Sequence, residues 1–113
     1  MRCLVLILAI CIKLKATVRN KTMLILVDTS RSHTFVSSAF VQLARLPTMN
    51  IPQERIHLAN YTWMSTTKQV KNLDWYIQGH TFTTDMIVLD QLPYDVVLGY
   101  DWLKTFSPMQ CDW

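Results

Sequence analysis

The sequence is short of glycine and cysteine, and each shortage narrows what the chain can be. Average usage would give about eight glycines in a chain of this length. Only Gly79 and Gly99 are present, so turns that favour glycine must be made largely from other residues. The three cysteines, Cys3, Cys11 and Cys111, form no C-x-x-C pair and leave an odd thiol. Neither a disulfide framework nor a zinc site is therefore predicted.

Charge is also sparse, at 17% of the chain, and the formal net charge of +3 is spread without a basic run. This is mild for a nucleic-acid binder, so no nucleic-acid contact is expected. No linker or low-complexity tract divides the 113 residues, and half of them are hydrophobic. One domain with a real core is predicted.

The N-terminus carries ten uncharged residues, 3–12, after Met1 and Arg2. This run has the length of a signal-peptide apolar region and is too short to span a bilayer. No small-x-small cleavage site follows closely, and residues 13–18 alternate as in a half-buried strand. We expect residues 1–11 to be an apolar leader, either a signal peptide or a gene-model artefact, and residues 12–113 to form the domain. Cytoplasmic location is favoured over secretion, with no membrane contact.

Short β-type segments account for most of the domain. The apolar run at residues 22–27 is typical of a strand buried on both faces. Two hairpins are predicted, from segments 55–58 with 63–67 and 70–77 with 81–89, followed by a buried strand at 96–99, a helical turn at 101–105 and an edge strand at 109–113. Many short strands with one or two helices predict an all-β domain closed like a small barrel.

One amphipathic helix is predicted before Pro47. Val36, Phe40, Leu43 and Ala44 fall at helical spacing, and Ser37 or Ser38 stands near the start. This pattern predicts a helix of about ten residues. We expect Phe40 and Leu43 to cover one side of the sheet, over Val27 and Leu98 in adjacent buried strands.

Asp28 is the main candidate for chemistry, because it ends an apolar strand, where a carboxylate is costly unless hydrogen-bonded or functional. Asp28-Thr29-Ser30 is also ordinary turn chemistry. Asp90 also follows an apolar run, but Gln91-Leu92-Pro93 lacks the hydroxyl residue. Asp101 is interpreted as a cap of the short helix, and Asp95 and Asp112 as surface or turn residues. One chain therefore supplies one aspartate with the pattern of Asp28.

The sequence resembles the retropepsin-like aspartic proteases of plant Ty3/gypsy long-terminal-repeat retrotransposons. The resemblance covers residues 12–113 and rests on the strand, Asp-Thr and polar loop of residues 24–37, the hairpin of residues 75–86, and the apolar residues, Gly99 and helix of residues 96–103. The terminal segment 107–113 is also similar to that family. The resemblance implies a single-lobe, retropepsin-like acid protease barrel, mainly β with one or two short helices.

The resemblance also implies an endopeptidase that cuts peptide bonds of a retrotransposon polyprotein. The active form would be a homodimer in which two copies of Asp28 activate a water, with Thr29 bracing the loop and Ser30 and Gly99 supporting it. No cofactor and no metal would be needed, because water is the nucleophile. The flap and substrate-binding residues would be Ala59, Asn60, Tyr61, Thr62 and Trp63.

Departures from the family pattern lie on two functional loops. Ser30 stands where the family has glycine, and a Cβ there costs about 1 kcal/mol or more. Arg31 follows, and a guanidinium favours ionised carboxylates, whereas the mechanism needs a shared proton. Tyr61 replaces the glycine of the flap tip. These features support an alternative, an inactive dimerisation or protein-binding module; a third reading, a small secreted protein, rests on residues 1–12 alone.

The remaining reactive or aromatic residues favour ordinary structural roles. His33, His57 and His80 lack metal-ligand spacing and are read as loop or surface residues. Ser30 or Ser32 beside His33 lacks a nucleophile elbow, so no serine hydrolase is predicted. The four tryptophans, Trp63, Trp75, Trp102 and Trp113, are interpreted as core and hairpin residues, because no basic patch lies among them.

Overall fold

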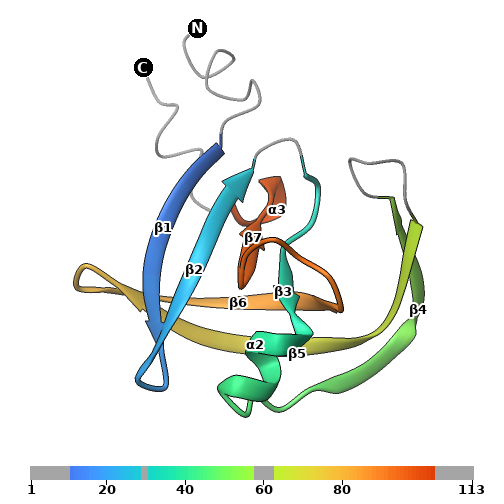
Figure 1. The fold of residues 1–113 in the computed structure, drawn as a ribbon, viewed down its shortest axis with the longest axis horizontal. Coiled ribbons are helices and arrows are strands. Elements are labelled where there is room, and N and C mark those ends of the chain that lie inside the picture. Colours follow the sequence, from blue (N-terminus) through green and yellow to red (C-terminus); the bar gives the residue numbers. More distant parts are fainter. Residues whose placement is uncertain (1–10, 29–30, 58–62, 104–113) are drawn as a thin grey trace, which may run out of the picture.

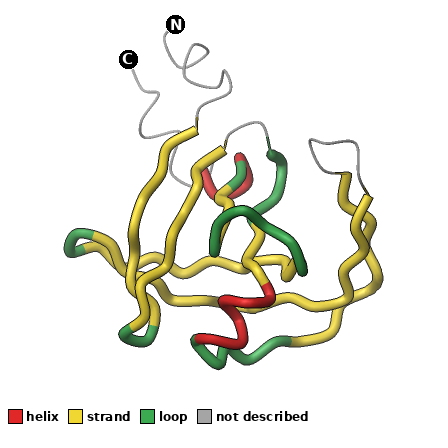
Figure 2. The backbone as a smooth tube through the Cα atoms, in the orientation of Figure 1, coloured by secondary structure: helices red, strands yellow, loops and turns green. Residues whose placement is uncertain are grey.

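A computed structural model describes residues 11–28, 31–57 and 63–103 of the chain (Figure 1). Its elements are β1 (Cys11–Val18), β2 (Lys21–Asp28), β3 (Phe35–Ser37), α2 (Ser38–Leu43), β4 (Met49–His57), β5 (Trp63–Ile77), β6 (His80–Leu89), β7 (Val96–Leu98) and α3 (Tyr100–Leu103). Strand dominates the backbone of the described residues, in which the helices are the two short segments α2 and α3 (Figure 2). The predicted all-β fold class, mainly β with one or two short helices, is confirmed.

The described strands form one sheet in the order β1-β2-β7-β3-β6-β5-β4. β1 also pairs with β5 through Thr17 and Tyr76, so the sheet curls back on itself as a barrel. β2 and β7 run parallel, with Val27 opposite Leu98, and these side chains are 7% and 0% exposed. The predicted adjacency of these two buried residues is confirmed.

β2 is buried on one face only, which corrects the prediction of a strand buried on both. Met23, Ile25 and Val27 point into the core, whereas Leu24 is 43% exposed and Leu26 is half-buried. Successive side chains of a strand point to opposite faces, and of the other face only the half-buried Leu26 packs against a second, smaller apolar cluster around Phe35 and Val97. Its other face carries Leu24, Leu26 and Asp28 toward a surface cavity.

The helix after β3 is shorter than predicted. α2 has six residues, and Ser37 caps it by accepting a hydrogen bond from the Phe40 amide at 3.0 Å. Val36 belongs to β3, where it pairs with Val88 and Val96. Phe40 is 1% exposed but Leu43 is 58% exposed, so the expectation that Leu43 covers the sheet is wrong. The first turn of the predicted helix is instead part of strand β3, so Leu43 is the last residue of α2.

β5 is a single strand of 15 residues that serves both predicted hairpins. It pairs antiparallel with β4 and with β6, which confirms the two hairpins. The break predicted between residues 67 and 70 is absent; an irregularity lies instead between Val70 and Leu73, where Asn72 has φ 53°. The β4–β5 hairpin lies on the opposite side of the molecule from the β1–β2 hairpin (Figure 1).

Turns of the described backbone are made with few glycines, as the composition predicts. Arg19 (φ 49°) and Asn20 (φ 66°) connect β1 to β2, and Gln78 (φ 49°) precedes Gly79 (φ 84°) between β5 and β6. Positive φ at both positions is typical of tight two-residue hairpin turns. The edge strand predicted at 109–113 and the end of the helical turn at 104–105 lie outside the described residues. Among the residues that are described, no helix is long and apolar enough to cross a membrane.

Candidate active site

Asp28 is the last residue of β2, between β1 and β7 in the sheet. The apolar alternation of β2 places Asp28 on the same face as Leu24 and Leu26, and its side chain is 14% exposed. The parallel β7 ends one residue before Gly99, so the ends of both strands meet beside this carboxylate. The fold of β2 thus places the largely buried carboxylate of Asp28 at the rim of a cavity.

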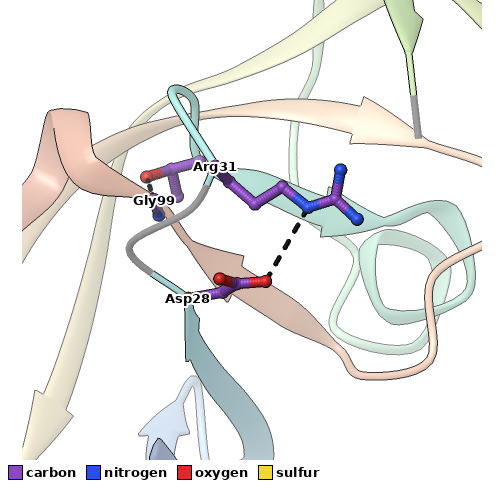
Figure 3. A network of polar contacts seen from close by, with 4 residues as sticks. Asp28, Arg31 and Gly99 are labelled. Atoms are coloured by element: carbon purple, nitrogen blue, oxygen red, sulfur yellow. Dashed lines mark hydrogen bonds and ion pairs between the residues drawn. The ribbon is translucent and has the colours of Figure 1, made fainter. Parts of the chain in front are cut away.

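Arg31 lies directly against Asp28 (Figure 3). Its amide donates to the Asp28 carbonyl oxygen at 3.1 Å. Its Nε is 3.8 Å from Asp28 Oδ2, and the arginine side chain is 26% exposed. This separation is an ion pair without a direct hydrogen bond. The close cation expected from the sequence is therefore present at the carboxylate.

Gly99 and the segment after Arg31 pack backbone to backbone. The Tyr100 amide donates to the Arg31 carbonyl oxygen at 2.7 Å. A Cβ on Gly99 would overlap the carbonyl oxygen of His33, with the carbonyl carbon at 2.7 Å and the Arg31 oxygen at 3.0 Å. Glycine is required here because of this close approach.

Thr34 and Asp101 join the segment after Arg31 to the start of α3, a pairing that the sequence alone does not predict. Thr34, which is 1% exposed, donates to Asp101 Oδ1 at 2.7 Å and accepts from the Gly99 amide at 3.1 Å. Asp101 lies in the first turn of α3 and also accepts from the Trp102 amide at 2.7 Å. The sequence indicates only a helix cap, because the partner hydroxyl is 67 residues away.

A cavity of about 740 Å³ opens beside Asp28 and Arg31. Its apolar wall comes from β2, β3, β5 and β7, through Leu24, Leu26, Phe35, Met64 and Val97. Residues 90–95 form a second wall, which includes the exposed Asp90. Asp95, predicted as a surface or turn residue, fixes this wall: its Oδ2 accepts from the Leu24 amide at 2.9 Å and its carbonyl from the Ser37 amide at 2.8 Å.

Of the predicted flap and loop residues, Trp63 lies in the described part of the chain. It begins β5, is 53% exposed, and lies under the guanidinium of Arg55, whose carbon is 4.7 Å from the ring centroid. Thr29 and Ser30, like Ala59, Asn60, Tyr61 and Thr62, lie outside the described residues. The structure therefore brings together Asp28 and Gly99 from the predicted set.

Other predicted roles can be compared with the structure. Trp75 is 1% exposed and stacks on Phe82 at 4.6 Å, so it is a core residue as predicted. Trp102 is partly buried and packs against this core, with its ring 5.8 Å from those of Trp75 and Phe82. Ser32 Oγ is 2.8 Å from His33 Nδ1, but both side chains are exposed and adjacent in sequence. Within the described ranges, no group of three His, Cys, Asp or Glu side chains could hold a metal ion.

Comparison with known proteins places this geometry in a family. A family model described as retroviral aspartyl protease matches residues 10–112. The retroviral protease-like domain of Ddi1 from Leishmania major is similar in structure, with a TM-score of 0.67 and 12% identity over 86% of this chain and 78% of that one. The EIAV protease, solved with the inhibitor HBY-793, gives 0.65 and 16% over 88% and 91%. No curated protein sequence matches the chain.

Proposed function

Because the chain belongs to the retroviral aspartyl protease family, we propose that it is an aspartic endopeptidase domain. In this proposal two chains form a homodimer in which their copies of Asp28 face each other. The observation that carries the proposal is the position of Asp28, which ends β2 at the rim of a cavity of about 740 Å³, beside the close approach of Gly99.

The proposed chemistry follows from pairing two carboxylates. One Asp28 carboxylate takes a proton from water, and the protonated partner donates a hydrogen bond to the carbonyl of the peptide bond. Asp90 lines the same cavity but is exposed, and it lacks the Thr that follows Asp28. The second carboxylate therefore has to come from a second chain. Thr29 would brace each loop from below.

The proposed substrate is an extended peptide segment, bound by strand-like pairing. The apolar wall of the cavity suits hydrophobic side chains on either side of the cut bond. Residues 59–63, at the end of the β4–β5 hairpin, would cover the bound peptide. We further propose a retrotransposon polyprotein of the plant Ty3/gypsy type as the source of both domain and substrate, and a cytoplasmic location; the motif resemblance and the odd cysteine count support these points.

A second candidate function is a catalytically silent dimerisation or protein-binding module. The Arg31–Asp28 ion pair favours it, because a cation of the same chain lies against the carboxylate that the proposed chemistry needs. Ser30, in place of the family glycine, favours it as well.

Cleavage of a random peptide library, with sedimentation of the same sample, tests the proposal. The parent chain should cut peptides as a dimer, and Asp28→Asn should lose cleavage while remaining dimeric. If the serine strains the loop, Ser30→Gly should cut faster, by about tenfold for each 1.4 kcal/mol of strain relieved. Cleavage by a monomer would refute the dimer, and a dimer that cuts nothing in either the parent or the Ser30→Gly form would favour the binding module.

A further inference from the structure

We propose that the guanidinium of Arg31 binds a carboxylate on a side chain of the substrate, so that the cavity selects peptides with Glu or Asp close to the cut bond. This inference rests on the proposed endopeptidase function and adds the chemical class of its substrate.

The backbone of Arg31 is fixed relative to the catalytic candidate. Its amide donates to Asp28 at 3.1 Å, and its carbonyl oxygen accepts from Tyr100 at 2.7 Å. The same oxygen is 3.0 Å from the position that a Cβ of Gly99 would take. Because this backbone is already held in place, binding a ligand adds no cost of ordering the main chain here, which favours the use of Arg31 in recognition.

The guanidinium keeps donors available for a ligand. It has five N–H groups in a planar fork. Nε faces Asp28 Oδ2 at 3.8 Å, too far for a hydrogen bond. Within the described residues no other group accepts from this side chain, and Figure 3 shows it extending past Asp28 with Nε turned toward the carboxylate. The two terminal nitrogens match the two oxygens of a carboxylate.

The surroundings of Arg31 also favour the binding of a carboxylate. Its side chain is 26% exposed and lines the same cavity as Phe35 and Met64, so a charge pair there is less screened than at an open surface. The other acidic groups of the cavity do not take this position in the part of the chain that is described: Asp95 accepts from the Leu24 amide, and Asp90 is exposed at the end of β6. The cavity, at about 740 Å³, has room for a substrate side chain.

Binding of uncleavable peptides to the full chain tests the inference without requiring catalysis. The probes are acetylated and amidated decapeptides with a central Leu-Phe pair joined by a hydroxyethylene group, carrying Glu or Gln at each flanking position in turn. Fluorescence polarisation gives the affinity for the parent, Arg31→Ala and Arg31→Lys. Arg19→Ala is the matched control, because Arg19 is an exposed arginine in the β1–β2 turn, outside the cavity.

The parent should bind the Glu peptide at least about tenfold more tightly than its Gln partner at one or more positions. Arg31→Ala should reduce this ratio to about one, Arg31→Lys should keep part of it, and Arg19→Ala should keep all of it. A ratio near one in the parent, a ratio that survives Arg31→Ala, or no binding of any peptide would overturn the inference. A preference seen only for peptides with a free C-terminus would assign Arg31 to a chain end and overturn the side-chain assignment.

Cleavable versions of the same peptides separate the two proposals. A Glu preference in binding without any cleavage would leave the recognition role of Arg31 standing and remove the endopeptidase function. Cleavage with equal affinity for Glu and Gln peptides would leave the endopeptidase function standing and remove the recognition role of Arg31.

Discussion

Replacing Gly99 with alanine should destabilise the domain far more than replacing Gly79, although Gly79 is the glycine with positive φ. The Gly99 Cβ would overlap the His33 carbonyl group and press on the Arg31 carbonyl oxygen. All of these atoms are backbone, so no side chain can rotate away. Overpacking in a tight region costs about 1–3 kcal/mol.

The clash would also disturb two hydrogen bonds. The Gly99 amide donates to Thr34 Oγ1 at 3.1 Å, and the Tyr100 amide donates to Arg31 at 2.7 Å. Each bond contributes about 1 kcal/mol, so we expect Gly99→Ala to lower the free energy of unfolding by about 3–5 kcal/mol. For a domain of this size, that lowers Tm by more than about 10 °C.

Thermal unfolding followed by circular dichroism checks this prediction. Gly79→Ala is the control, because nothing lies within 4 Å of its added Cβ and its φ of +84° is the source of strain. That strain should cost about 1 kcal/mol, or a few degrees in Tm. A Gly99→Ala variant that melts within 3 °C of the parent, or a larger loss in Gly79→Ala, would refute the steric reasoning.

Three further predictions concern other parts of the fold. Thr34→Val should lose about 2 kcal/mol of stability in urea unfolding, because it removes both the donor to Asp101 and the acceptor of the Gly99 amide. Thr34→Ser keeps the hydroxyl and should lose less than half as much, so equal losses in the two variants would argue against a role of the hydroxyl. Trp75→Ala should cost about 3–5 kcal/mol in the same assay, because the ring is 1% exposed and stacks on Phe82; a smaller loss than in Thr34→Val would contradict the packing. Removing residues 109–113 should convert the proposed dimer to monomer in sedimentation, and an unchanged dimer would place the interface elsewhere.

The parts of the fold that sequence predicts are those set by local alternation. Residues 13–18 and 22–27 alternate or run apolar within a few positions, and both become strands. Val36 shows where this fails, since it fits a helical spacing with Phe40 and also a sheet position between Val88 and Val96. Sheet partners 50 or more residues away decided its state, and no local pattern contains them.

The candidate site likewise contains one residue that the sequence predicts and one that it does not. A carboxylate at the end of an apolar strand is unusual chemistry that can be seen in the sequence, so Asp28 could be found. The role of Thr34 comes from contacts with Asp101 and Gly99, which are 67 and 65 residues away. An isolated threonine in a polar loop carries no sign of such partners.

The pairing of Thr17 with Tyr76, which closes the sheet, has a consequence for the order of folding. It joins strands separated by about sixty residues, whereas the β1–β2 and β5–β6 hairpins close through two-residue turns. Hairpins form in microseconds and distant pairings later, so we expect closure to be a late step. During synthesis the edge of β1 that pairs with β5 then remains unpaired until β5 has been made. The exposed Lys13 and Lys15 of β1 supply the charges that discourage a strand edge from pairing with another chain.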